Sequence, residues 1–238
     1  GYKRTLNKLY ARTISSYTGL NCGGKVNLGT NRLFGGLKRH LPLLIALLGS
    51  AIILAPQSVH AFSGTGAGTL GDPYEIRSCS ELLQISNNLA VYYELVDDVD
   101  CSGTTYTAIG TSGSPFTGSL DGNLQTISHV TISSGNSQGI FGYTTGATIK
   151  NIKLSNNAFS GTNTIASLVG SPTDGVISNV RADNTNSVIS TSGSAGGLVG
   201  IAYGTLQLSK SYYNGTVESA GAGYIGGLVA RLQGNVVI

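Results

Sequence analysis

A short motif of small and apolar residues recurs at a near-constant interval through the second half of this chain. Its four copies end at Gly142, Gly170, Gly200 and Ala230, which are separated by 28, 30 and 30 residues. An interval of roughly 20 to 50 residues is typical of solenoids, in which one repeat cannot bury its own apolar face. The motif therefore predicts stacked coils rather than a globular domain.

Each repeat also has the residue pattern of β-strands. Residues 147–154 and 176–180 alternate between apolar and polar side chains, as strands with one buried face do. β-branched runs near Phe159, Ile189 and Val217, together with the Leu-Val pairs of the motif, add two strands per repeat. Three strands joined by small corner residues predict an all-β fold, a right-handed parallel β-helix. Six aliphatic residues are expected to form its inward-facing core: Ile149, Leu168, Ile177, Leu198, Leu208 and Leu228.

The first 61 residues have the layout of a long secretory signal. Residues 1–40 are basic and acid-free, residues 41–55 are apolar, and Val59-His60-Ala61 fits a signal peptidase site. Fifteen apolar residues are few for a membrane span, which favours cleavage after Ala61 over a retained anchor. The long basic region is similar to the extended signal of Gram-negative autotransporters. This similarity implies secretion, or display on the outer surface of a Gram-negative bacterium.

The charge distribution argues against a nucleic-acid partner. The chain has a formal net charge of +3, but residues 1–61 hold eight of its 14 basic side chains and none of its 11 acidic ones. The remainder is therefore acidic overall and lacks the basic surface that nucleic acids require. Only 11% of residues are charged and 35 are Gly, which suits a β-solenoid better than a cytosolic enzyme.

A cap is predicted at residues 62–104, before the β-helix of residues 105–238. Ser78 and Glu81 form a capping-box pattern. We expect a short helix from about residue 80 to residue 89 to cover the open end of the first coil, and residues 91–96 to be the first strand of the stack.

The far end of the predicted β-helix stops in mid-repeat at Ile238. An uncovered coil end is a template for aggregation, and solenoids normally cover it. We therefore expect this chain to be a fragment whose last coil packs against further residues of the same protein.

Two cysteines remain after removal of the predicted signal, which contains Cys22. Cys79 and Cys101 would form a disulfide in an oxidising compartment, and two buried free thiols are the alternative. The disulfide would join the helix to the first coil and stabilise the fold by about 3 kcal/mol. The sequence has no Cys-x-x-Cys and no His-Glu-x-x-His motif, so neither a metal site nor another cofactor is expected.

Several motifs follow one another in a specific order between Gly64 and Ile238. They are Gly-x-Gly before Asp-Pro-Tyr-x-Ile, then Leu-x-x-Asp-x-Asp-Cys-Ser-Gly, Phe-x-Gly-x-Leu-Asp-Gly-Asn and the Gly-Leu-Val-Gly repeats. This order resembles the GLUG-motif family of bacterial surface proteins. The resemblance implies an exported right-handed β-helix of the adhesin or haemagglutinin type, sometimes joined to a separate metallopeptidase domain. It implies no catalytic residue within the repeats.

Two groups of polar residues are candidates for a functional site. One is an acidic group suited to acid/base chemistry or Ca²⁺ binding, although such residues often hydrogen-bond turn amides instead. The other is a set of tyrosines suited to stacking on sugars or on a partner, although such rings often pack at the edge of a core. The acidic group is Asp97, Asp98, Asp100 and Asp121, and the tyrosines are Tyr203, Tyr212, Tyr213 and Tyr224.

These features favour a non-catalytic surface protein that attaches to a protein or glycan on a host or neighbouring cell, or that acts as a spacer. The first alternative is the stalk of a larger surface enzyme of the metallopeptidase type. The second is a carbohydrate-active β-helix that uses the acidic group.

Overall fold

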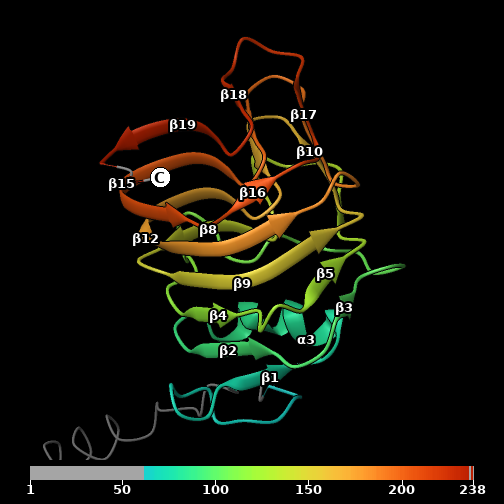
Figure 1. The fold of residues 1–238 in the computed structure, drawn as a ribbon, viewed down its shortest axis with the longest axis vertical. Coiled ribbons are helices and arrows are strands. Elements are labelled where there is room, and N and C mark those ends of the chain that lie inside the picture. The colour runs from blue at the N-terminus through green and yellow to red at the C-terminus, as the bar shows by residue number, and fades with distance from the viewer. Residues whose placement is uncertain (1–61, 236, 238) are drawn as a thin grey trace, which may run out of the picture. The chain divides into compact units, whose positions relative to one another are not determined.

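A computed structural model of the chain describes residues 62–235 and residue 237. The predicted signal peptide, residues 1–61, lies outside the described residues, as does Ile238. The described chain winds as a parallel β-solenoid of about five turns (Figure 1), which confirms the predicted parallel β-helix. Within this region, no helix is long and apolar enough to cross a membrane.

Three sheets run along the stack. The largest has the strand order β1-β2-β4-β9-β12-β15-β19, with β3, β5, β8 and β16 pairing beside that path. Its strands are β1 (Tyr74–Ile76), β2 (Tyr92–Leu95), β3 (Val99–Asp100), β4 (Ser119–Asp121), β5 (Thr126–Ser128), β8 (Phe141–Thr145), β9 (Thr148–Ser155), β12 (Val169–Ala182), β15 (Val199–Ser209), β16 (Tyr212–Tyr213) and β19 (Val229–Gly234).

The other two sheets contain four short strands each. The second sheet consists of β6 (Thr131–Ile132), β10 (Ala158–Gly161), β13 (Ser187–Ser190) and β17 (Thr216–Ser219). The third consists of β7 (Ser137–Gln138), β11 (Thr164–Ala166), β14 (Ser194–Gly196) and β18 (Ile225–Gly226). A full turn, for example β9 to β12, visits all three sheets. The Leu-Val pairs, expected to form separate strands, instead lie at the bend where the chain enters the next long strand.

Equivalent residues of successive repeats lie directly above one another. Ile149 pairs with Ile177, which pairs in turn with Leu208. The backbone N–H of Leu168 donates to the carbonyl of Leu198 (3.2 Å), and that of Leu198 donates to Leu228 (3.0 Å). All of these residues are buried except Leu228, which belongs to the last described coil and is partly buried. The repeat period thus stacks the aliphatic residues of successive coils into two columns, Ile149–Ile177–Leu208 and Leu168–Leu198–Leu228.

The helix of the cap is shorter than the sequence predicts. Helix α3 (Cys79–Gln84) is followed by a 3₁₀ turn, η2 (Ile85–Asn87), and the chain is extended at Asn88. Ser and Asn compete with the helical backbone for hydrogen bonds, which accounts for the early end. Ser78 caps the helix as expected, with its side chain accepting from the backbone N–H of Glu81 (3.3 Å).

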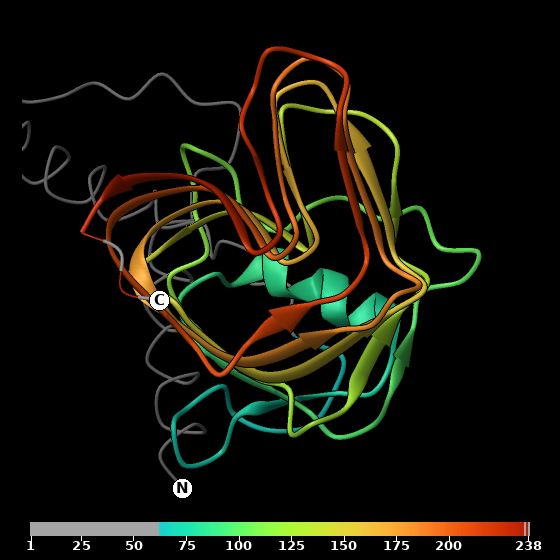
Figure 2. The same ribbon diagram turned by 45° about the horizontal axis from the view of Figure 1, so that its top comes forward.

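The helix packs at the N-terminal end of the core. Leu82 and Ile85 are fully buried there, and Figure 2 shows α3 lying across the interior of the coils. The expected disulfide is present and joins Cys79 of the helix to Cys101 after β3. The stack begins one turn earlier than predicted, because β1 already pairs with β2, the strand predicted to be first.

Candidate ligand-binding groove

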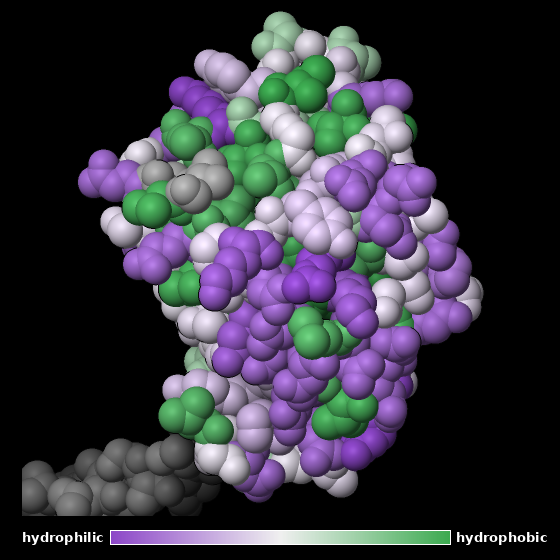
Figure 3. Space-filling view, in the orientation of Figure 1, coloured by the Kyte–Doolittle hydropathy of each residue, from purple (hydrophilic) through white to green (hydrophobic). Residues whose placement is uncertain are grey.

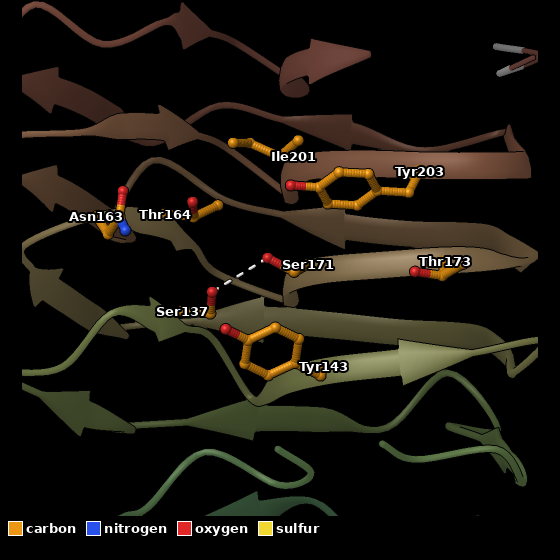
Figure 4. A pocket seen from close by; sticks show the side chains of 8 residues that line it. All are labelled: Ser137, Tyr143, Asn163, Thr164, Ser171, Thr173, Ile201 and Tyr203. Carbon is orange, nitrogen blue, oxygen red and sulfur yellow. Dashed lines mark hydrogen bonds between the residues drawn. The ribbon is translucent and has the colours of Figure 1, made fainter. Parts of the chain in front are cut away.

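A groove runs between two outer walls of the solenoid. One wall is the third sheet, and the other is the first part of β8, β12 and β15, which the chain enters after a sharp bend. Figure 2 shows these walls as two arms that meet at an inward-pointing corner. A cavity of about 390 Å³ lies in the groove (Figure 4). Its lining residues are Ser137, Tyr143, Asn163, Thr164, Ser171, Thr173, Ile201 and Tyr203.

Glycine permits the bend at the bottom of the groove. A Cβ atom at Gly200 would lie 2.3 Å from Cγ2 of Thr164 and 2.4 Å from the carbonyl oxygen of Gly170. A Cβ at Gly170 would lie 2.9 Å from the backbone nitrogen of Gln138. Backbones that approach so closely leave no room for a side chain. The repeated glycine of the motif therefore shapes the groove as well as the coil.

The cavity exists because one coil lacks a large side chain. Tyr143 of β8 and Tyr203 of β15 flank it, whereas β12 contributes the small residues Ser171 and Thr173 between them. Ser171 pairs with Tyr143, and Thr173 pairs with Tyr203. Since coils are about 4.8 Å apart, the two tyrosines lie roughly 10 Å apart along the stack. They are also offset by two residues along the strands, because Tyr203 is equivalent to Thr145 rather than to Tyr143. Both tyrosine hydroxyls point toward the opposite wall (Figure 4).

The chemistry of the lining is neutral and rich in hydrogen-bonding groups. Ser137 and Ser171 join the two walls through a hydrogen bond of 3.1 Å between their hydroxyls. Thr164, Thr173 and the tyrosines supply further hydroxyls, and Asn163 supplies an amide. None of the eight lining residues is acidic, basic or a histidine. Such a surface can bind a polyhydroxylated molecule, because each hydroxyl can both donate and accept.

The four tyrosines predicted as a binding patch lie in different surroundings. Tyr203 is 37% exposed in the groove, and Tyr212, 46% exposed, lines a separate hollow. Tyr213 packs against the core and donates its hydroxyl to the carbonyl of Thr216 (3.1 Å), and burial raises its pKa. The ring of Tyr224 lies 4.8 Å from the guanidinium carbon of Arg231.

Arg231 extends the wall of the groove toward the last coil. It pairs with Ile201, one of the residues that line the cavity. Its contact with Tyr224 therefore forms a cation–π pair beyond the end of the neutral cavity.

Each residue of the predicted acidic group has its own hydrogen-bonding or ionic partner. Asp97 lies 3.8 Å from the guanidinium of Arg77, and Asp98 accepts from the backbone N–H of Thr126 (2.6 Å). Asp121 lies 3.0 Å from Nζ of Lys150. No group of three or more His, Cys, Asp or Glu residues in the described chain could hold a metal ion.

Asp100 is bound within its own turn. It accepts from the backbone N–H of Ser102 (2.9 Å), and its Oδ1 lies 2.9 Å from Nδ1 of His129. The hydrogen bond from Ser102 is the main reason that the pKa of Asp100 is lowered. Such a carboxylate is poorly suited to act as a general acid.

Sequence reasoning did not identify Tyr143 and Ser171 as candidate site residues. Their position in the repeat could have identified them, because each directly follows a repeat glycine, Gly142 or Gly170. Ile201 follows the next repeat glycine, Gly200, in the same way. A residue at this position follows the bend and points into the groove. What the sequence does not reveal is that the third sheet forms the facing wall.

Comparison with models of known protein families found no match, so the resemblance to the GLUG-motif family stays a prediction. The chain is 36% identical over 152 residues to halomucin of Haloquadratum walsbyi, an alignment that covers 57% of this chain and 2% of halomucin. Its fold is similar to the crystal structure of a protein from Bacteroides ovatus provisionally named an immunoglobulin A1 protease. The TM-score is 0.57 at 18% identity, covering 72% of this chain and 66% of that one. The comparisons thus support a β-solenoid segment that also occurs within a much longer protein.

Proposed function

We propose that this chain is part of an exported surface protein and that its solenoid attaches the cell to a neutral glycan through the groove. The observation that carries the proposal is the cavity between Tyr143 and Tyr203, which is lined by hydroxyls and an amide and by no charged side chain. The alignment with 2% of halomucin fits a segment of a long surface protein. Location on a Gram-negative outer surface stays a prediction.

A glycan suits this cavity better than other ligands do. The face of a tyrosine ring is apolar and its hydroxyl is polar, which matches a sugar ring with its C–H faces and peripheral hydroxyls. A charged ligand would find no counter-ion among the lining residues. The groove is built on paired strands, so its geometry exists before the ligand binds and little ordering entropy is lost.

Attachment requires no catalytic group, and the arrangement of the carboxylates supports a non-catalytic role. General acid/base chemistry needs a titratable group within hydrogen-bonding distance of the substrate. None of the cavity-lining residues has a carboxylate, and the acidic residues discussed above bind backbone amides or cations outside the cavity.

Glycan binding by the full chain tests the proposal. We expect neutral oligosaccharides on an array to be retained, and replacement of Tyr203 by Ala to weaken calorimetric binding by about tenfold through loss of one stacking face. Tyr92→Ala is the matched control, since Tyr92 is similarly exposed and lines neither the groove nor the separate hollow. Retention of no neutral glycan, or unchanged affinity of Tyr203→Ala, would refute the proposal.

A second candidate function is a rigid stalk that spaces an enzyme from the cell surface. It is supported by the fold shared with the Bacteroides ovatus protein named for a protease activity. Attachment requires the groove to bind a glycan, whereas a stalk does not. If the gene encodes a peptidase domain next to this chain and groove variants leave attachment unchanged, the stalk is favoured.

A further inference from the structure

Two basic side chains are stacked in register on the outer face of the largest sheet. Lys153 of β9 pairs with Arg181 of β12, and Arg181 pairs with Tyr212 of β16. Thr126 of β5 pairs with Lys153 on the other side. These four residues line a hollow of about 280 Å³ together with Leu154, Ser155 and Asp183. It shares no lining residue with the groove.

Neither cation has an acidic partner within the described part of the chain. The salt bridges found in the described chain involve Arg77, His129 and Lys150, but not Lys153 or Arg181. Like charges on directly opposed strand positions destabilise a sheet, by roughly 0.2–1 kcal/mol for such a pair. The pair is therefore unfavourable in the free protein and would be favourable beside a bound anion.

The one acidic residue of the hollow is bound to its own turn. Asp183 accepts from the backbone N–H of Thr185 (3.0 Å) and from Nδ2 of Asn186 (2.9 Å). The guanidinium of Arg181 is oriented by a hydrogen bond from its Nε to Oδ1 of Asn179 (3.2 Å). No protein acceptor for its two terminal nitrogens is found within the described chain, so a ligand can take up their hydrogen bonds.

We propose that this hollow is a binding subsite for an acidic sugar, a unit that carries a carboxylate or a sulfate. The guanidinium of Arg181 offers a fork that fits either group, and Lys153 adds a second charge. The ring of Tyr212 provides an apolar face for the sugar, and Thr126 and Ser155 provide hydroxyls. An acidic peptide would also pair with Lys153 and Arg181, but it would interact less favourably with the ring of Tyr212 and with the hydroxyls. The site is independent of the neutral groove proposed above.

Calorimetric titration of the full chain tests this subsite with four defined probes. A galacturonate hexasaccharide carries carboxylates and a κ-carrageenan hexasaccharide carries sulfates, so they distinguish the two acidic groups. Maltohexaose is the neutral sugar, and hexaglutamate is the acidic peptide. Variants Lys153→Gln and Arg181→Gln each remove one cation, whereas Lys210→Gln removes an exposed cation that does not line the hollow.

We expect at least one acidic hexasaccharide to bind, with affinity that falls as salt is added. Loss of a charge-assisted hydrogen bond should weaken binding by about tenfold or more in Lys153→Gln and in Arg181→Gln, while Lys210→Gln should stay within about twofold of the parent chain. Melting temperatures no lower than that of the parent chain would show that these surface variants are folded.

Three results would overturn the assignment. They are failure of both acidic hexasaccharides to bind, equal binding of these sugars by all three variants, and binding of maltohexaose or hexaglutamate that Lys153→Gln and Arg181→Gln weaken as much as they weaken binding of the acidic sugars. Because Tyr203 and Tyr143 lie outside the hollow, their variants report on the groove separately, and either proposal can fail without the other.

Discussion

Single residues at the corners of the coils adopt left-handed backbone conformations. Asn151 (φ 58°), Asn179 (φ 53°) and Lys210 (φ 51°) occupy equivalent positions in successive coils. Asn151 donates to Asp121 (2.9 Å), and Asn179 donates to Asn151 (2.8 Å), which forms a ladder of side chains. Asn tolerates this conformation, but Lys is strained in it. The ladder therefore ends at a residue that is unfavourable for the corner.

Replacing Lys210 by Asn should stabilise the protein. The change relieves the left-handed strain and allows the new amide to contact Asn179, so we expect the free energy of unfolding to rise by about 1 kcal/mol. The melting temperature should rise by about 2–4 °C. Lys210→Ala is the control because it removes the same charge without suiting the backbone. Equal stability of the two variants would contradict the strain argument.

Asp121, the first residue of this side-chain ladder, makes the free energy of unfolding depend on pH. Partial burial raises the pKa of Asp121, but hydrogen bonds from Asn123, Asn151 and Lys150 outweigh burial and hold it below its ordinary value of 3.8. A lowered folded pKa means that the unfolded chain binds more protons, so this contribution is present above about pH 4 and is lost below it.

Asp121→Asn should therefore flatten the acid limb of the stability profile. Urea unfolding at pH 3, 4, 5 and 7 would show a smaller loss of stability between pH 5 and pH 3 than in the parent chain. The control is Asp72→Asn, at an exposed turn outside the ladder. If the two variants lose stability in parallel with the parent chain, Asp121 does not contribute as described.

At the scale of strands and bends, stacking decides which glycines are required. Gly197 and Gly227 occupy the same position in consecutive repeats. A Cβ at Gly197 would lie 2.0 Å from the carbonyl oxygen of Gly227 and 2.5 Å from the ring of Tyr213, whereas a Cβ at Gly227 meets nothing within 4 Å. The difference arises because Gly197 has another coil directly above it.

Gly197→Ala should consequently destabilise the solenoid by about 1–3 kcal/mol, the usual result of overpacking. Gly227→Ala should change the free energy of unfolding by less than about 0.5 kcal/mol. Denaturant unfolding of the two variants makes the comparison. Similar losses in both would show that backbone freedom, rather than coil stacking, selects glycine here.

The capping helix depends on its covalent connection to the first coil. The disulfide between Cys79 and Cys101 closes a loop with a sequence separation of 22 and a Cα–Cα distance of 5.0 Å. Replacing both cysteines by Ala should lower the free energy of unfolding by about 3 kcal/mol through the larger freedom of the unfolded chain. The parent chain should lose a similar amount in reductant, and the variant should be insensitive to it. Equal stability of the reduced and oxidised parent would rule out this contribution.

The sequence predicted elements whose signals are local and repeated. The repeated motif predicted the length of one coil, and the recurring aliphatic positions predicted which residues stack in the core. The capping pattern at Ser78 predicted where the helix begins. Asn157 and Asn186 were missed, although they form a buried hydrogen-bonded pair (3.0 Å), because nothing in their spacing reveals that their side chains turn inward. The groove was missed for a related reason: its two walls come from different sheets, and their angle is set by the packing of backbones at the bends.

For the whole molecule, surface polarity changes along the stack. Figure 3 shows a largely hydrophilic face over the middle coils and apolar side chains gathered over β15 and β19. Three large apolar side chains of the last described coil are exposed: Ile225 (57%), Leu232 (46%) and Val237 (63%). The equivalent residues of the preceding coil are buried by the turn that follows them. Ala195 is covered by Ile225, and Ala202 is covered by Leu232.

The apolar side chains that the last described coil exposes favour pairing between molecules. We expect the chain to associate in a concentration-dependent way, and the double variant Ile225→Lys/Leu232→Lys to shift sedimentation velocity profiles toward the monomer because paired lysines repel an incoming copy. Leu70→Lys, which changes another exposed apolar residue (77%) far from this coil in sequence, is the control. If both variants associate like the parent chain, another surface drives association.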